Sequence, residues 1–218
     1  PTNIMGATKR TAEIYCQNLN NLNKTKFITV RFGNVLGSAG SVVPLFKEQI
    51  ERGGPITVTH PDIERYFMTI PEASRLILQA IVNGNGGEIF VLDMGEPIKI
   101  KALAEQIIRL SGKTPYKDID ITYTGLRAGE KLYEELFYAL EELVPTKHDK
   151  ILMAKSRNIA WEQFIDLLSQ LEANCHKSSN SQLRELIKLL VPEYHSEAEH
   201  AVSAAITKEH QLEKNLEA

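Results

Sequence analysis

The stretch Phe27-Ile-Thr-Val-Arg-Phe-Gly-Asn-Val-Leu-Gly-Ser-Ala-Gly-Ser41 joins a β-branched and aromatic run directly to a loop with three glycines. The run predicts a β-strand over 27–32, because such side chains pack well on a pleated sheet. A helical pattern over 42–51 follows the loop and stops at Gly53-Gly54-Pro55. Such a loop can bring backbone N–H groups close to a phosphate, although it lacks the GxGxxG spacing of a dinucleotide site. A plain connection is the alternative interpretation.

Strands and helices alternate along the rest of the chain. Apolar positions that recur every three or four residues predict helices at 6–22, 71–82 and 100–110 and beyond 159. Short β-branched runs predict strands at 56–59, 66–70, 88–93, 119–123 and 150–154. We expect the stretch 126–135 to lead into a short helix. The alternation predicts an α/β domain with a largely parallel sheet.

Composition excludes several classes of function. The formal net charge is −3, with both signs spread along the chain and no basic stripe, so we expect no nucleic-acid binding. Cys16 and Cys175 stand outside any CxxC spacing, which favours reduced thiols in a cytosol-facing protein. The six histidines are scattered without an HExxH pattern, so we expect no metal site. No apolar run approaches the roughly 18 residues of a membrane span.

The opening helix carries a candidate catalytic pair, Met5 and Lys9. The two residues are one helical turn apart and therefore share a face. A lysine so placed can hold a cofactor ribose or a diphosphate, whereas a methionine has no exchangeable proton. The alternative is a core methionine, with Lys9 in a surface ion pair with Glu13.

Two arginines lie in or beside loops. Arg65 follows Pro61-Asp-Ile-Glu64, and Arg127 stands between Gly125 and Gly129. A planar guanidinium suits a diphosphate, and Arg127 with Glu130 could together clamp a phosphate and a sugar hydroxyl. The alternative is a surface ion pair of Arg65 with Glu64 or Asp62, which would contribute little.

Several motifs together resemble the extended short-chain dehydrogenase/reductase family, and within it the bacterial UDP-N-acetylglucosamine 4,6-dehydratases of capsule, O-antigen and glycan biosynthesis. The similar stretches are 3–10, 30–37, 40–46, 64–68, 126–132 and 190–194. Most extended members carry a tyrosine where this chain has Met5, so the resemblance is to the methionine-bearing branch. It covers about residues 1–194.

The resemblance implies the C-terminal part of such an enzyme: a Rossmann-like parallel sheet plus a small substrate-binding subdomain, without the N-terminal half that carries the NAD fingerprint. Residues 1–158 would form this part of the catalytic domain, 159–195 a helical extension and 196–218 a polar, frayed tail. The resemblance further implies a cytoplasmic homo-oligomer, attached to a membrane only through an N-terminal region outside this chain. Without its N-terminal partner region, we expect the chain to be inactive.

The implied reaction is the NAD-dependent dehydration of a UDP-N-acetylhexosamine, UDP-N-acetylglucosamine above all, to a UDP-4-keto-6-deoxy sugar. NAD⁺ takes the hydride from C4, water leaves across C5 and C6, and the hydride returns to C6. Two alternatives stay open. A nucleotide-sugar 4-epimerase or reductase would need the tyrosine that Met5 replaces, and a non-catalytic nucleotide-sugar-binding module would have less reason to keep Lys9.

The resemblance also implies roles for single residues. Lys9 would hold the nicotinamide ribose, and Met5 occupies the place of the acid/base tyrosine, whose work falls to an Asp-Lys pair upstream of this helix. The residues expected at the cofactor are Lys9, Arg31, Phe32 and Gly33. The residues expected at the UDP-sugar are Asn34, Ser41, Val42, Pro44, Ile56, Val58, Arg65, Arg127 and Glu130. Among these, Asn34 and the arginines would meet the diphosphate, Glu130 a ribose hydroxyl, and the backbone of 56–58 the uracil.

Overall fold

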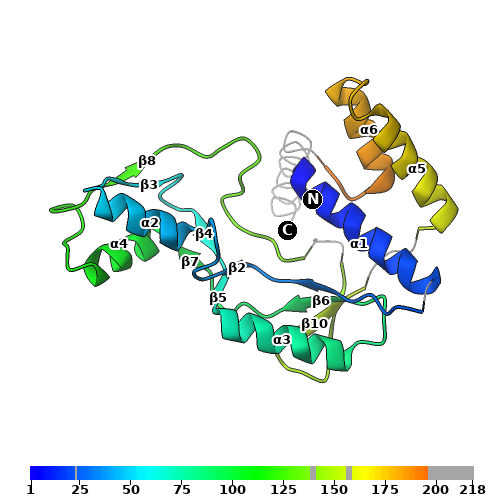
Figure 1. Ribbon diagram of the computed structural model, residues 1–218, viewed down its shortest axis with the longest axis horizontal. Coiled ribbons are helices and arrows are strands. Elements are labelled where there is room, and N and C mark those ends of the chain that lie inside the picture. The colour runs from blue at the N-terminus through cyan, green and yellow to red at the C-terminus, as the bar shows by residue number, and fades with distance from the viewer. Residues whose placement is uncertain (23, 138–140, 156–158, 196–218) are drawn as a thin grey trace, which may run out of the picture. The chain divides into compact units, whose positions relative to one another are not determined.

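The computed structural model describes residues 1–22, 24–137, 141–155 and 159–195 (Figure 1). The chain divides into two compact units: Pro1–Phe27 with Arg157–Ala218 forms unit 1, and Ile28–Ser156 forms unit 2. The opening helix is thus grouped with the C-terminal helices, whereas the division expected from the sequence joined it to the residues up to 158. The expected tail, 196–218, lies outside the described residues.

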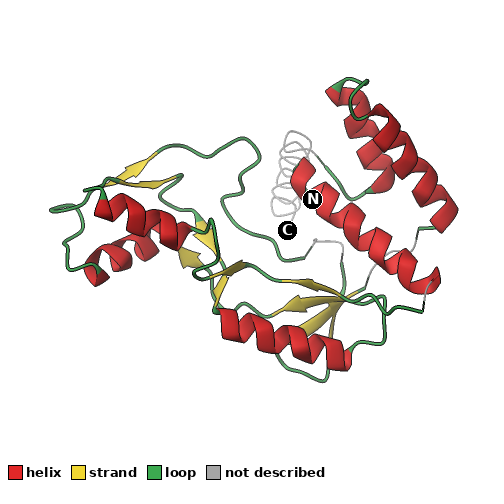
Figure 2. Cartoon of the chain, in the orientation of Figure 1, coloured by secondary structure: helices red, strands yellow, loops and turns green. Residues whose placement is uncertain are grey.

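Unit 2 is built on a four-stranded mixed sheet with the order β1-β6-β10-β9 (Figure 2). Its strands are β1 (Thr29–Arg31), β6 (Ile89–Leu92), β10 (Ile151–Ala154) and β9 (Leu143–Pro145). Strand β1 runs parallel to β6, while β10 runs antiparallel to both of its neighbours. All four residues of β6 are buried, as its continuous apolar run requires of a central strand.

Helix α3 (Ile70–Asn83) packs on this sheet through one apolar stripe. Leu76 and Ala80 belong to the same buried cluster as Phe90 and Leu92 of β6. The helix begins where the side chain of its N-cap, Thr69, accepts a hydrogen bond from the third residue of the helix, and Pro71 fits the first turn because it needs no N–H partner there.

Unit 2 has a second hydrophobic core, apart from the one beneath α3. Helices α2 (Val42–Glu51) and α4 (Ile100–Leu110) pack with the parallel strands β3 (Ile56–Val58) and β8 (Ile121–Tyr123) around buried isoleucines. Two short pairs complete the unit: β2 (Asn34–Val35) runs parallel to β5 (Phe67–Met68), and β4 (Glu64–Arg65) antiparallel to β7 (Ile98–Lys99).

Unit 1 is helical and consists of α1 (Ile4–Leu22), α5 (Trp161–Asn174) and α6 (Asn180–Leu190). Its apolar core includes Ile14, Phe164 and Leu190. Arg10 lies in this interior with only 2% of its surface exposed, and it is the one charged residue found buried in the described part of the chain. Its guanidinium forms ion pairs with Glu13 and Glu193.

The predicted α/β class is confirmed, and helices α2 and α4 begin and end where the sequence predicts. The short helix expected after residue 126 is not found in the described residues 126–137, which form loops, turns and bends. Gly125 and Gly129 take positive φ angles of 84° and 78°, which interrupt a helical course. Both cysteines are free thiols. No helix in the described ranges has the length and apolar character needed to cross a membrane.

Candidate functional site

Unit 2 contains a cavity of about 250 Å³ between α2, β3 and the segment that follows β8. Seven of the nine residues that the sequence predicts at a UDP-sugar line it: Asn34, Ser41, Val42, Val58, Arg65, Arg127 and Glu130. Pro44 and Ile56 do not, and Ile56 is fully buried in the core. The structure therefore brings most of this predicted set to one place, although its members are spread over almost a hundred residues of sequence.

The N-terminus of α2 forms one wall of the cavity. Ser41 is the N-cap, but its side chain makes no capping hydrogen bond. Its buried Oγ has no hydrogen-bond partner among the described residues. The first N–H groups of a helix have no partner within the helix, so those of Val42 and Val43 are available to a ligand, while Pro44 has none to offer. A helix end of this kind suits an anionic group.

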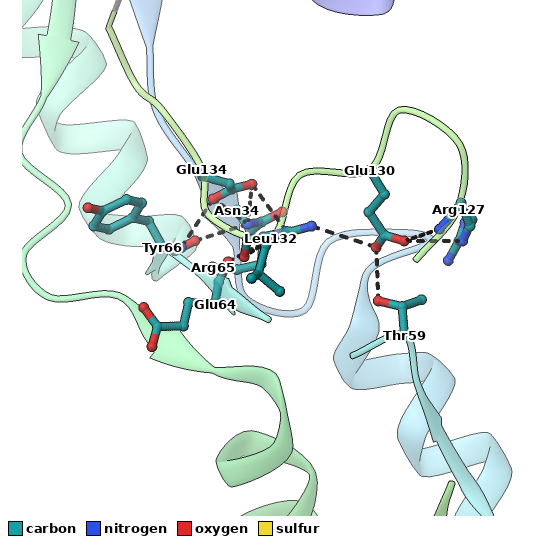
Figure 3. A network of polar contacts seen from close by, with 9 residues as sticks. All are labelled: Asn34, Thr59, Glu64, Arg65, Tyr66, Arg127, Glu130, Leu132 and Glu134. Carbon is teal, nitrogen blue, oxygen red and sulfur yellow. Dashed lines mark hydrogen bonds and ion pairs between the residues drawn. The ribbon is translucent and has the colours of Figure 1, made fainter. Parts of the chain in front are cut away.

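Arg65 lies at the centre of a polar network beside the cavity (Figure 3). Its Nη1 donates hydrogen bonds to the carbonyl oxygens of Glu64 and Leu132, at 2.7 and 3.3 Å. Its Nη2 is 3.6 Å from a carboxylate oxygen of Glu130, and its Nε is 3.7 Å from one of Glu134. The expected alternative, an ion pair with the Glu64 or Asp62 carboxylate, is wrong. Because the contacts with Glu130 and Glu134 are longer than a hydrogen bond, Nε and Nη2 can still donate to an anion that comes closer.

Glu130 joins this network to the second predicted arginine. Its Oε1 accepts a hydrogen bond from Thr59 Oγ1 at 3.1 Å, and its Oε2 accepts one from the backbone N–H of Arg127 at 3.1 Å. The Arg127 guanidinium is 3.9 Å from Glu130 and its side chain is 80% exposed. Arg127 is thus a solvent-exposed positive charge at the cavity, whereas Arg65 is held by hydrogen bonds.

Sequence reasoning missed Glu134, which holds three groups of the network. Its carboxylate accepts hydrogen bonds from Asn34 Nδ2 and from the backbone N–H of Tyr66, all at 3.1–3.2 Å, besides facing Arg65. Asn34 Nδ2 also donates to the carbonyl oxygen of Tyr66. The two amide hydrogens of Asn34 are therefore engaged within the protein, which leaves its Oδ1 as the atom to meet a ligand. No local sequence signal marks Glu134, because its partners lie 68 to 100 residues away.

Strand β3 offers the cavity one edge of its backbone. The N–H of Ile56 donates to Asp120 and the carbonyl of Val58 accepts from Thr124, so these two residues face β8. Backbone groups alternate sides along a strand, and Thr57 therefore faces the opposite edge. Its N–H donates to Gln49 Oε1 at 3.0 Å, and its Oγ1 accepts from Gln49 Nε2 at 2.7 Å. Of residues 56–58, which were expected to contact uracil through their backbone, only Thr57 has backbone groups that face away from β8.

The residues expected at NAD in unit 2 are engaged in packing and ion pairing. Arg31 forms a two-pronged ion pair with Glu141, at 2.6 and 3.0 Å, and both side chains are nearly buried. A Cβ on Gly33 would lie 2.8 Å from the Cβ of Tyr66, so this glycine is required by close packing. Phe32 is 36% exposed. These residues do not by themselves form a dinucleotide site.

Met5 and Lys9 lie on the exposed face of α1 in unit 1. Met5 is 63% exposed, so the alternative of a core methionine is wrong. Lys9 is also exposed, and Glu13 pairs with the neighbouring Arg10. The opposite face of α1, with Ala7, Arg10 and Ile14, is buried. The pair is therefore exposed on one face of α1, and the cofactor role of Lys9 stays a prediction.

We expect the 218-residue chain to bind NAD weakly or not at all. Arg31 and Gly33 are engaged elsewhere, and the sequence lacks the GxGxxG spacing of a dinucleotide site. Isothermal titration of the chain with NAD should therefore give a Kd weaker than about 1 mM. Saturable binding in the micromolar range would contradict this expectation.

Comparison of the sequence with known proteins shows which protein family it resembles. Residues 1–156 match the family described as polysaccharide biosynthesis protein. The capsular polysaccharide biosynthesis protein CapD of Staphylococcus aureus is 62% identical over 156 residues, which are 71% of this chain and 26% of CapD. The chain thus spans about a quarter of the length of this relative.

Solved structures with a similar fold include the following two. Pen from Bacillus thuringiensis is 32% identical with a TM-score of 0.59, covering 78% of this chain and 58% of Pen. The UDP-glucose 4-epimerase of Thermotoga maritima, solved with UDP-glucose, is 22% identical with a TM-score of 0.52, covering 62% and 44%. The chain accordingly has a Rossmann-like α/β fold, which it shares with both structures. On its sequence match over 1–156, the chain belongs to the polysaccharide biosynthesis protein family.

Proposed function

We propose that this chain is the substrate-binding part of an NAD-dependent 4,6-dehydratase that acts on a UDP-N-acetylhexosamine, with UDP-N-acetylglucosamine as the substrate. The product is a UDP-4-keto-6-deoxy sugar for a bacterial surface polysaccharide. The observation that carries the proposal is the cavity of unit 2, which joins two arginines to a helix N-terminus with a buried, unpaired Ser41 hydroxyl. The relative CapD, named for capsular polysaccharide biosynthesis, supports the biological setting.

The charges of the cavity suit the three parts of a UDP group. A diphosphate would lie between Arg65, Arg127 and the first turn of α2, where positive charge and free N–H groups converge. Glu130, between Arg127 and Thr59, would accept a hydrogen bond from a ribose hydroxyl. The base would reach the edge of β3 at Thr57. Each part thus meets a group of opposite charge or matching hydrogen-bonding character.

We prefer dehydration to epimerisation because of Met5. A thioether cannot exchange a proton, and an epimerase on this scaffold would need an acid/base residue at that position. Product analysis of a longer protein that contains this chain decides between the two. A 4-keto-6-deoxy sugar from UDP-N-acetylglucosamine supports our proposal, and UDP-N-acetylgalactosamine would support the epimerase.

The proposal extends to the setting of the enzyme. NAD would be the cofactor of the complete enzyme and would be held mainly by an N-terminal part that this chain does not include. The enzyme would work as a homo-oligomer in the cytoplasm, where nucleotide sugars are made. Any attachment to the inner membrane would come from that N-terminal part.

The direct test is the binding of UDP to the 218-residue chain by isothermal titration. We expect the chain to bind UDP, and Arg127→Ala to weaken binding about tenfold, because one charged hydrogen bond to the diphosphate is lost. Arg127 is 80% exposed, so its removal leaves the fold intact. Arg52→Ala is the matched control, since Arg52 is 74% exposed and lies outside the cavity lining. No UDP binding by the unchanged chain would refute the proposal.

A further inference from the structure

At the β3 side of the cavity, a side chain of α2 contacts one of the residues that line it. Gln49 follows the cavity residue Leu45 by one helical turn and reaches Thr57, which also lines the cavity. Its amide makes two hydrogen bonds there, one to Thr57 Oγ1 at 2.7 Å and one from the Thr57 N–H at 3.0 Å. Gln49 is half-buried, so its side chain has room to move away without disturbing the core.

The chemistry of this contact matches that of a nucleobase edge. A primary amide presents an acceptor oxygen next to a donor N–H, and the imide edge of uracil presents the same pair. The N–H and the carbonyl of Thr57 both point away from β8, toward the edge where Gln49 now lies. A base that paired with this edge would need the position that the Gln49 oxygen occupies.

The size of the cavity also suggests that a base needs the space that Gln49 occupies. With Gln49 in place the cavity measures about 250 Å³, below the roughly 300–1,000 Å³ of most small-molecule sites. Turning the Gln49 side chain outward would lengthen the cavity along β3, where a base would follow the ribose. The core residues beneath, such as Phe46 and Ile50, are buried and have no comparable freedom.

We propose that Gln49 gates the base end of the cavity: its amide occupies the place of a uracil imide edge at Thr57 and is displaced when a uridine nucleotide binds. This inference rests on the proposed function, because it takes the ligand to be a UDP group. Binding then exchanges two protein hydrogen bonds for two hydrogen bonds to the base. Since Gln49 carries no charge, the exchange moves no proton and adds no pH dependence to binding.

The test compares variants of the 218-residue chain by isothermal titration with UDP and with inorganic pyrophosphate. Gln49→Ala removes the competing amide, so we expect it to bind UDP about tenfold more tightly, the worth of two ordinary hydrogen bonds. Thr57→Val removes only the bond to Oγ1 and should give a smaller gain, of about threefold. Pyrophosphate has no base, so its affinity should be unchanged in both variants. Gln106→Ala, on the exposed face of α4, is the matched control.

The outcomes separate the gating role from the proposed function. If the unchanged chain binds UDP measurably and Gln49→Ala binds it with equal or lower affinity, the gating role alone is overturned. A gain for pyrophosphate as large as that for UDP also overturns it, because the effect would then lie at the phosphate end. If neither protein binds UDP, the proposed function fails and the gating role fails with it. Circular dichroism confirms that each variant is folded.

Discussion

Replacing Arg10 with methionine should lower the free energy of unfolding of unit 1 by about 3–5 kcal/mol, the usual cost of breaking a buried ion pair from one side. Arg10 is 2% exposed, and its Nε and Nη1 donate to Glu193 and Glu13 at 2.6 and 3.0 Å. Methionine fills a similar volume but leaves the two carboxylates without their cation. The loss is large because neither carboxylate can be fully rehydrated among α1, α5 and α6.

The single tryptophan of the chain, Trp161, lies in the helical unit, so its fluorescence during urea unfolding reports on that unit. Lys177→Met is the control, since Lys177 is an exposed basic residue of the same unit, between α5 and α6. We expect it to cost less than about 1 kcal/mol. A loss in Arg10→Met no larger than in this control would show that the ion pair stabilises nothing.

The same ion pair predicts how stability depends on pH. Burial alone would raise the pKa of the Glu193 carboxyl, but its hydrogen bond to Arg10 and the arginine charge outweigh this, and the pKa is lowered. The pair therefore contributes stability above the pKa of an unfolded glutamate, and this contribution is lost as the pH falls through the lowered folded pKa. The stability difference between the unchanged chain and Glu193→Gln should shrink from pH 7 toward about pH 3. A difference that stays constant over this range would contradict the assignment.

Replacing Arg65 with methionine should weaken UDP binding about a hundredfold, in line with the loss of one partner of a desolvated charge pair. Arg65 is 16% exposed and is oriented by two carbonyl oxygens. Its Nε and Nη2 have only long contacts with carboxylates, so they are the groups that a diphosphate would engage. Arg65→Lys keeps the charge but not the planar fork, and an intermediate loss is expected.

The measurement is again isothermal titration of the 218-residue chain, with UDP and with pyrophosphate. Both ligands should lose affinity to a similar degree, because Arg65 would act on the phosphates and not on the base. Arg109→Met, an exposed change in the same unit, controls for the lost charge. UDP affinity within twofold of the unchanged chain would mean that the diphosphate lies elsewhere.

The parts of the fold that could be predicted from the sequence are those with local causes. Helix α2 ends at the glycine pair that follows it, and α4 ends at Ser111-Gly112, so both boundaries are marked in the sequence. The buried strand β6 was predicted from its unbroken apolar run, with ends that differ by one residue on each side. Their positions in or beside loops likewise indicated Arg65 and Arg127, and the family resemblance indicated Ser41; all three residues line one cavity.

The parts that could not be predicted depend on contacts between distant residues. Glu141 forms an ion pair with Arg31, which is 110 positions away in the sequence. The residues around either one carry no pattern that predicts this contact. The contact of Gln49 with Thr57 is closer in sequence, yet it depends on how α2 lies along β3. The long-range contacts of Glu130 and Glu134, with Thr59 and with the Tyr66 N–H, likewise have no local signal in the sequence.

The segment between β8 and β9 carries Glu130 and Glu134, and both carboxylates face the guanidinium of Arg65. A diphosphate at Arg65 would compete with both carboxylates for one positive charge. Ligand binding and attachment of the segment are then linked, and each must weaken the other by the same factor. The segment would thus serve as a counterion within the protein: its carboxylates neutralise Arg65 in the absence of ligand, and phosphate oxygens would replace them when a diphosphate binds.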